Sequence, residues 1–252
     1  MIEICAIASG SNGNCYYVGN GEDAILVDVG VSRRQVFERM NKQGLKAAKI
    51  KAIFISHEHG DHFRGVKILS KKLDVPVYMT SKTWERSWHP NRPEYVKVFN
   101  PGDVVNIGSF NIHTFLKKHD AAEPCSFRIE HNGINVGVFT DIGSVCDRVS
   151  NEISLCQALF LESNYDEEML WAGPYPDHLK RRVAGENGHL SNLQAFNLVN
   201  QFHHPQLKVV FLSHLSHENN RPDVAAAAFK ALETRFVVKL TNRFAAADVF
   251  VL

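Results

Sequence analysis

The sequence is poor in the features that mark secreted or membrane-spanning proteins. Its five cysteines are odd in number and form no C-x-x-C pair, which argues against a disulfide framework and predicts reduced thiols in a cytoplasm. No apolar run approaches the roughly 20 residues of a transmembrane helix, so we expect no membrane partner. The N-terminal stretch MIEICAIASGSNGNC lacks a basic segment before its apolar one, so we expect no signal peptide.

The sequence also has no excess of charge of one sign. Lysine and arginine number 28 against 27 aspartates and glutamates, so there is no global basic field of the kind that drives non-specific binding to nucleic acids. Any recognition of phosphate must therefore be local. Linkers and low-complexity tracts are absent too, and 44% of the 252 residues are hydrophobic, so we expect a single domain over residues 1–252. Nothing in the pattern indicates an oligomeric state.

Strand and helix patterns recur in two similar halves. The middle of the chain contains two hairpins, with turns near Gly108 and at His131 to Gly133, and helices alternate with strands from Asp147 to a last strand near Val249. This order predicts two sheets packed face to face with helices outside, a four-layer αββα sandwich of the α/β (α+β) class. In the first half we expect strands at 2–8, 15–18, 24–27 and 52–55, and helices at 31–44 and 63–73.

Three histidines and an aspartate follow the expected strand 52–55 in the stretch SHEHGDH. Residues two apart in an extended segment point the same way, so His57 and His59 can converge on one ion. The chain then turns at Gly60 and offers Asp61 and His62 to a second position. Imidazole and carboxylate suit zinc, manganese or iron. The alternative is a solvated polar loop, which such a dense set of ligands directly after a buried strand disfavours.

The H-x-H-x-D-H motif resembles the metallo-β-lactamase superfamily, and the rest of the chain fits that resemblance. The superfamily requires a further histidine, an aspartate and a last histidine, each at the end of a strand, and the chain offers them in that order in FLKKHD, VFTDIG and VFLSHLSHEN. The resemblance implies two divalent metal ions. The first would be held by His57, His59 and His119, the second by Asp61, His62 and His214, with Asp141 between them and His217 as a weaker rival to His214.

Two further motifs are similar to the phosphodiesterase branch that contains the transfer-RNA 3′-processing enzymes. ALFLESNYD places Glu162 at a strand end, and GHLSN places His189 just before a helix that begins near Ser191. In that branch the corresponding histidine, oriented by the glutamate, helps to protonate the leaving oxygen, and Asp61 can help to hold the attacking water. The alternative to this catalytic role is a structural one, in which His189 is only the residue at the start of the helix and Glu162 is a buried acid paired with an arginine.

The stretches ASGSNGNCYYV, HDAAEPCSF, LESNYDEEML and GPYPDHLKRR extend the resemblance, nearly end to end, to the YycJ (WalJ) group of this superfamily. That group implies a cytoplasmic phosphodiesterase, with members described as 5′ exonucleases, in which a hydroxide bridging the two ions attacks phosphorus. DNA is then expected as the partner in preference to RNA. The alternatives are hydrolysis of a small cyclic nucleotide or other small diester, and a non-catalytic metal-binding sensor.

Basic and small residues near these motifs are candidates for contacts with the flanking phosphates of a substrate. Two basic clusters precede His119 and His189, and the loop 9–14 is rich in small residues whose amides can approach a phosphate. The alternatives are a solvated basic face for each cluster and an ordinary turn for the loop. The candidates are Lys117, Lys118, Lys180, Arg181, Arg182, Ser9, Ser11 and Asn12.

Overall fold

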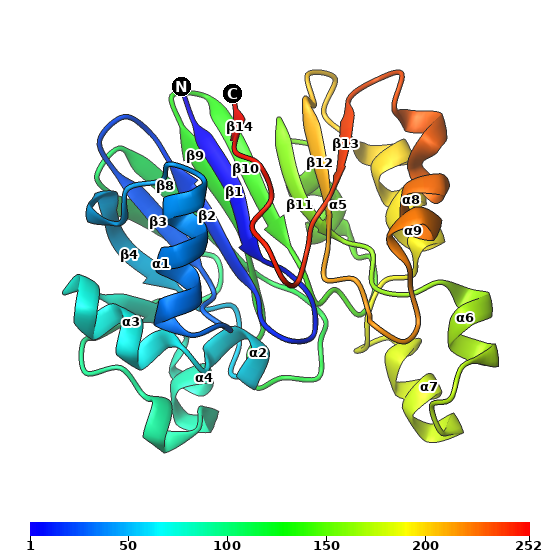
Figure 1. Cartoon of the computed structure of the whole chain (residues 1–252), viewed down its shortest axis with the longest axis horizontal. Helices are drawn as coiled ribbons and strands as arrows, with labels where there is room; N and C mark the ends of the chain where they lie inside the picture. The colour runs from blue at the N-terminus through cyan, green and yellow to red at the C-terminus, as the bar shows by residue number, and fades with distance from the viewer.

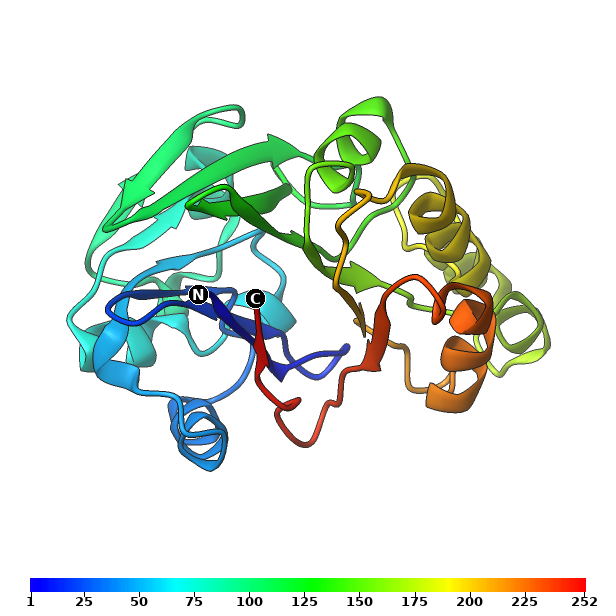
Figure 2. The ribbon, with the colours of Figure 1, turned by 90° about the horizontal axis from the view of Figure 1, so that it is seen from above.

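Two seven-stranded sheets face each other in the computed structural model, which describes all 252 residues (Figures 1 and 2). The first sheet has the order β14-β1-β2-β3-β4-β5-β6 and the second the order β13-β12-β11-β10-β9-β8-β7. The strands are β1 (Glu3–Ala8), β2 (Cys15–Gly19), β3 (Ala24–Val27), β4 (Ile50–Phe54), β5 (Val77–Met79), β6 (Val96–Val98), β7 (Val104–Ile107), β8 (Phe110–Leu116), β9 (Cys125–His131), β10 (Ile134–Phe139), β11 (Ala158–Glu162), β12 (Val209–Ser213), β13 (Val237–Leu240) and β14 (Phe250–Val251).

Helices cover the outer face of each sheet. Helices α1 and α3 pack on the first sheet, and α5, α8 and α9 pack on the second, so the expected four-layer sandwich is confirmed. Helices α6 and α7 lie beyond the second sheet, at the lower right of Figure 1. The helices are α1 (Arg33–Lys42), α2 (Gly60–Phe63), α3 (Val66–Leu73), α4 (Ser81–Arg86), α5 (Asp147–Ile153), α6 (Glu167–Ala172), α7 (Asp177–Val183), α8 (Asn192–Phe202) and α9 (Pro222–Phe229), with short 3-10 turns at Ala47–Lys49, His89–Asn91 and Lys230–Leu232.

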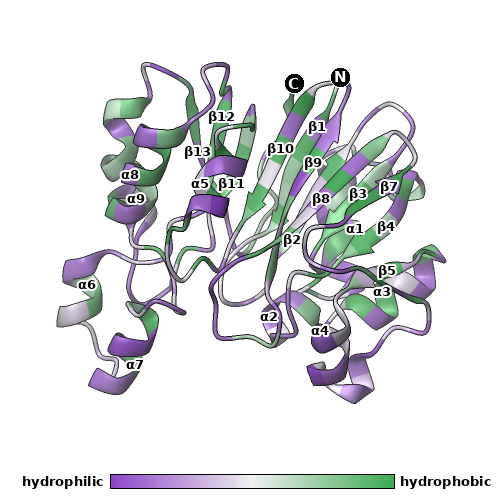
Figure 3. Ribbon diagram, turned by 180° about the vertical axis from the view of Figure 1, so that it is seen from behind, coloured by the Kyte–Doolittle hydropathy of each residue, from purple (hydrophilic) through white to green (hydrophobic).

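The core between the sheets is built from the alternate residues of their inner faces. A cluster of 23 buried residues fills this space, and aromatic rings dominate it. Tyr16 of the first sheet packs on Phe160 of the second with 5.0 Å between ring centroids, and Phe54 meets Phe127 edge-on at 5.6 Å. Figure 3 shows that hydrophobic residues are concentrated in the strands of both sheets. Burial of such rings supplies the main force that holds the two halves together.

Both sheets are mixed, and their parallel strands end at one common edge. β3, β4, β5 and β6 pair in parallel, as do β10, β11, β12 and β13, while the remaining pairs are antiparallel. The two hairpins expected in the middle of the chain are β7 with β8 and β9 with β10. The loops that follow the parallel strands therefore gather at one edge of the sandwich, the lower edge in Figure 1.

The expected helix over residues 63–73 is wrong in one respect, because the structure divides this segment between α2 and α3. The chain breaks at Arg64 and Gly65. A Cβ atom at position 65 would lie 2.0 Å from the carbonyl oxygen of Val31, so only glycine allows this close approach. The break separates α2, which carries Asp61 and His62, from α3.

Candidate metal centre

The histidines and carboxylates expected as ligands lie together where the strands end. Asp28, Asp141 and His214 each follow a strand in the left-handed backbone region, with φ angles of 62°, 54° and 56°. This conformation is uncommon for residues other than glycine and is often kept at functional sites. The chain thus turns directly after each strand, and the three side chains lie at the ligand cluster, where Asp28 contacts His62 and His214 contacts Asp61.

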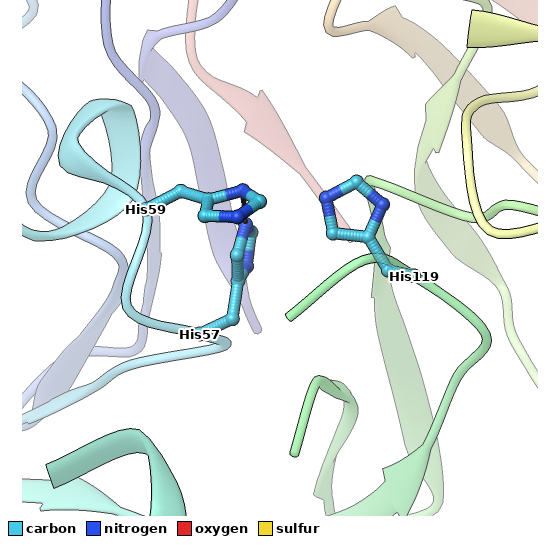
Figure 4. Close-up of side chains that lie close together, drawn as sticks. All are labelled: His57, His59 and His119. Atoms are coloured by element: carbon cyan, nitrogen blue, oxygen red, sulfur yellow. Dashed lines mark hydrogen bonds between the residues drawn. The ribbon is translucent and has the colours of Figure 1, made fainter. Parts of the chain in front are cut away.

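The first group joins the two sheets through three imidazole rings (Figure 4). His57 and His59 follow β4, and His119 faces them from the loop after β8. His57 Nε2 lies 3.0 Å from His59 Nδ1, and the ring centroids of His57 and His119 are 5.0 Å apart. Hydrogen bonds hold the rings from behind, between His57 Nδ1 and Ser56 Oγ at 2.9 Å and between His119 Nδ1 and the Gly188 carbonyl at 3.0 Å. The three rings can therefore serve one ion.

The second group lies beside the first and contains carboxylates as well as imidazoles. Asp61, His62 and His214 form it, with His62 Nε2 3.3 Å and His214 Nε2 3.4 Å from Asp61 Oδ2. Asp141 lies between the two groups: its Oδ2 is 3.1 Å from His62 Nε2, and its Oδ1 is 3.8 Å from His119 Nε2. The arrangement fits two neighbouring metal positions that share the carboxylate of Asp141.

The electrostatic environment differs between the two groups. Burial lowers the pKa of His119 to about 4 and that of His57 well below its usual range, so both rings are neutral near pH 7, as ligands must be. Burial alone would also lower the pKa of His62 and His214. The nearby carboxylates, chiefly that of Asp141, outweigh this effect and raise the pKa of His62 well above its usual range and that of His214 to about 10. Positive charge is therefore stabilised at the second group, as a divalent cation requires.

Two buried atoms of the cluster, His119 Nε2 and Asp141 Oδ2, make no hydrogen bond of ordinary geometry. Their nearest polar neighbours are other residues of the centre and its rim: Asp141 Oδ2 is 3.1 Å from His62 Nε2, and His119 Nε2 is 3.3 Å from Asp120 Oδ1. An unpaired buried polar atom is costly, and such atoms are rare in folded proteins. Imidazole nitrogen and carboxylate oxygen are the donors that zinc, manganese and iron accept. The free donor atoms and the donor chemistry both fit divalent metal ions at these residues.

Glu162 connects the cluster to His189. Its Oε1 accepts hydrogen bonds at 2.8 Å from His189 Nδ1 and at 3.0 Å from His214 Nδ1, and its carboxylate also accepts the amides of Asp141, Ile142 and Leu190. Burial alone would raise the pKa of Glu162, but His189 and the hydrogen bonds to both histidines lower it to about 2. Glu162 therefore pairs with histidines and not with an arginine, and it leaves Nε2 of the partly exposed His189 free.

Sequence comparisons agree with the motifs. The family model of the metallo-beta-lactamase superfamily matches residues 8–124. The exodeoxyribonuclease YycJ of Bacillus anthracis is 36% identical over 227 residues, which cover 89% of this chain and 86% of YycJ. The exodeoxyribonuclease WalJ of Streptococcus pneumoniae serotype 2 is 32% identical over 224 residues, which cover 87% of this chain and 83% of WalJ. The chain belongs to the metallo-β-lactamase superfamily. Within it the chain falls in the YycJ and WalJ group, and the expected hydrolase class is confirmed.

A solved structure of the superfamily shares the architecture. The metallo-β-lactamase fold protein YhfI of Bacillus subtilis superposes with a TM-score of 0.73 at 18% identity, over 98% of this chain and 100% of YhfI. At this identity the likeness concerns the fold alone. None of the helices has both the length and the apolar character needed to cross a bilayer.

Two residues of the centre were missed by the sequence analysis. Asp28 accepts hydrogen bonds from the amide and the hydroxyl of Ser56, both at 2.8 Å, and contacts His62 Nδ1. Asn14 places its side-chain nitrogen 3.0 Å from His62 Nε2 and 3.3 Å from Asp61 Oδ2. Both residues lie in short loops that look like ordinary turns. The one feature of the sequence that could have indicated them is their position: Asp28 directly follows β3 and Asn14 directly precedes β2, both at the common edge.

The lysines and arginines expected to contact substrate phosphates lie in different surroundings. Lys117 is buried and donates a hydrogen bond to the Thr140 carbonyl at 2.6 Å, and Lys180 is buried and donates to the Trp171 carbonyl at 2.7 Å. Their ammonium groups already have protein partners. Lys118 and Arg182 are exposed but lie beside carboxylates, 3.6 Å from Glu186 Oε2 and 2.6 Å from Asp120 Oδ2 respectively. Arg181 is exposed on α7.

The remaining candidates divide between the cluster and the surface. Ser9 is buried, and its hydroxyl accepts the amide of His214 at 2.8 Å, whereas Ser11 and Asn12 are exposed at the tip of the same loop. His217 is exposed and lies outside the groups described above, so the geometry favours His214 over this rival.

Proposed function

We propose that this chain is a dinuclear, divalent-metal-dependent phosphodiesterase that degrades DNA from the 5′ end. The observation that carries the proposal is the contact of His189 with Glu162 beside two overlapping ligand groups. The first ion would be held by His57, His59 and His119, the second by Asp61, His62 and His214, with Asp141 shared between them. The relatives named exodeoxyribonuclease support DNA as the substrate.

Zinc, manganese or iron ions held there would supply Lewis-acid stabilisation of the developing charge and lower the pKa of a water molecule. The protein's own part is positioning and proton transfer. Hydrolysis adds water across one P–O bond, so the departing oxygen needs a proton. His189 can deliver it from Nε2, because the hydrogen bond between Nδ1 and Glu162 fixes the orientation of its ring. Water is accessible on this side, since the His189 side chain is 20% exposed.

The test combines metal content with cleavage. The chain is loaded separately with Mn²⁺ and Zn²⁺, its metal content is measured, and it is incubated with 5′-labelled and 3′-labelled duplexes and with a chromogenic phosphodiester. Two ions per chain and stepwise release of nucleotides from the 5′ end are expected, with both activity and metal lost in His62→Ala. Turnover of the chromogenic diester with intact DNA would replace the DNA substrate by a small diester, and bound metal without turnover would indicate a sensor.

A further inference from the structure

A basic groove opens beside the candidate metal centre, on the side of the first sheet. It has a volume of about 710 Å³ and lies between the loop 9–14, the start of α1 and the break between α2 and α3. Arg33, Arg34 and Arg64 line it together with polar residues, glycines and the hydrophobic Val31 and Ile68, and no aspartate or glutamate is among the lining residues. All three arginines are exposed. Arg34 also pairs with Glu38 on the next turn of α1, with 3.4 Å between Arg34 Nε and Glu38 Oε1, and both side chains are exposed. The groove is still a local concentration of positive charge on a chain whose net charge is only +1.

The position of two of these arginines is unfavourable for α1 itself. Arg33 and Arg34 are the first two residues of the helix, whose first turn contains no acidic residue. The helix dipole places partial positive charge at this end, where anions stabilise a helix and cations destabilise it. Ser32 accepts only the amide of Gln35, so the amides of Arg33 and Arg34 have no acceptor within the helix. A bound anion would compensate both the side-chain charges and these free amides.

The groove adjoins the ligand cluster through α2 and the loop 9–14. Arg64 follows His62 by two residues, and its guanidinium donates hydrogen bonds to the Gly60 carbonyl at 3.2 Å and the Asn12 carbonyl at 3.0 Å. The same loop donates the amide of Asn14 to the Asp61 carbonyl at 2.8 Å. Figure 1 shows α2 near the lower end of α1, at the edge where the strands end. A strand lying over the centre can therefore extend towards this groove.

We propose that the groove of Arg33, Arg34 and Arg64 binds backbone phosphates of the DNA that flanks the cleaved bond. This inference rests on the proposed nuclease function. Arginine is suited to the task because its planar guanidinium binds a phosphate through two parallel hydrogen bonds. Contacts of this kind position a strand without reading its sequence. The groove would consequently contribute to the binding of a long substrate and not to the chemical step.

The test compares Arg33→Gln/Arg34→Gln with a charge-matched control, Lys230→Gln/Arg235→Gln. The control residues are exposed and precede β13, at the edge opposite the centre. Duplex DNA and bis(p-nitrophenyl) phosphate serve as substrates of the manganese-loaded protein.

For the groove variant we expect kcat/KM on DNA to fall on the order of tenfold, through an increase in KM. The slope of log affinity against log salt should become shallower by about 1 per lost contact. Turnover of the small diester should not change, and Tm should stay equal or rise because two cations leave the helix N-terminus.

Other outcomes separate this inference from the proposed function. An unchanged KM and salt slope on DNA would contradict phosphate binding by the groove. An equal loss of kcat/KM on both substrates would contradict it too, because the substitutions would then have damaged the metal centre. If the unmodified chain cleaves the small diester but not DNA, the proposed function fails. In that case fluorescence anisotropy measures the Kd of the same duplex for the groove variant and for the parent chain. A weaker Kd for the variant would support binding of DNA by the groove, and an equal Kd would contradict it. Arg33→Glu provides a second variant for every comparison.

Discussion

Asp28 holds His62 from the side away from the ligand cluster, with Asp28 Oδ2 2.7 Å from His62 Nδ1. Both side chains are fully buried. The contact fixes which ring nitrogen points into the site, because Nδ1 is engaged and Nε2 faces Asp61 and Asp141. A carboxylate behind a histidine in this way orients a ligand and raises its basicity. Asp28 therefore belongs to the centre although it touches no proposed metal position.

The first prediction follows from this contact. Asp28→Asn keeps the shape of the side chain but removes its charge, so metal affinity should fall by about 10- to 100-fold. Equilibrium dialysis against Zn²⁺ and Mn²⁺ measures the change. Asp23→Asn is the matched control, because Asp23 lies at the opposite end of β3, where its nearest cationic group is Lys51 Nζ at 3.7 Å. Equal metal affinity in the Asp28 variant and the parent chain would contradict the role assigned to Asp28.

The second prediction concerns proton transfer. His189→Ala should lower turnover by about 10² to 10⁴, the range for loss of a general acid, while both metals stay bound. Metal analysis and steady-state kinetics on the same preparation separate the two properties. His217→Ala should change neither property, since that side chain is exposed and outside the cluster. Loss of metal from the His189 variant would assign this histidine to the structure of the centre.

The third prediction distinguishes two adjacent lysines. Lys117→Ala should lower the free energy of unfolding by about 1–3 kcal/mol, because the Thr140 carbonyl loses its buried partner. Lys118→Ala should change it by less than about 0.5 kcal/mol, since the pair with Glu186 is exposed. Urea denaturation of the two variants provides the measurement. Equal stability of both variants would show that the buried ammonium group contributes nothing to folding.

The fourth prediction concerns the thiols. Burial raises the pKa of Cys5 and of Cys125 to about 12, so neither forms an appreciable amount of thiolate at pH 8. Cys146 is the one cysteine that is not buried. Iodoacetamide at pH 8 should therefore modify Cys146 first in the native protein, and mass spectrometry of peptides identifies the site. Early modification of Cys5 or Cys125 would mean that the packing around these thiols opens far more readily than their burial indicates.

Local patterns predicted the convergence of the H-x-H-x-D-H segment, and the resemblance to the superfamily then directed attention to three later strand ends. His57 and His59 are two apart in extended chain, and His119, Asp141 and His214 each follow a strand that apolar runs mark clearly. The structure places all of them at one edge. Their role as metal ligands stays a prediction. The turns at Gly108 and Gly133 could also be predicted from the sequence, because glycine is the residue that most readily adopts a positive φ angle. Both glycines adopt one in the structure.

Contacts between distant segments could not be predicted in the same way. The approach of Gly65 to Val31 divides an otherwise continuous helical pattern, and no local signal marks it. The burial of Lys117 contradicts the ordinary preference of lysine for solvent and depends on a carbonyl 23 residues later in the chain. Asp28 became part of the centre only when β3 and β4 paired and brought Ser56 and His62 to its side.

The two ligand groups are divided between the sheets. His57 and His59 follow β4 in the first sheet, whereas His119 follows β8 in the second, and His214 likewise reaches Asp61 across the gap. Neither half of the chain can therefore assemble a complete group by itself. An ion held there would cross-link the halves, so its uptake during refolding should follow the docking of the two sheets and not the formation of either one.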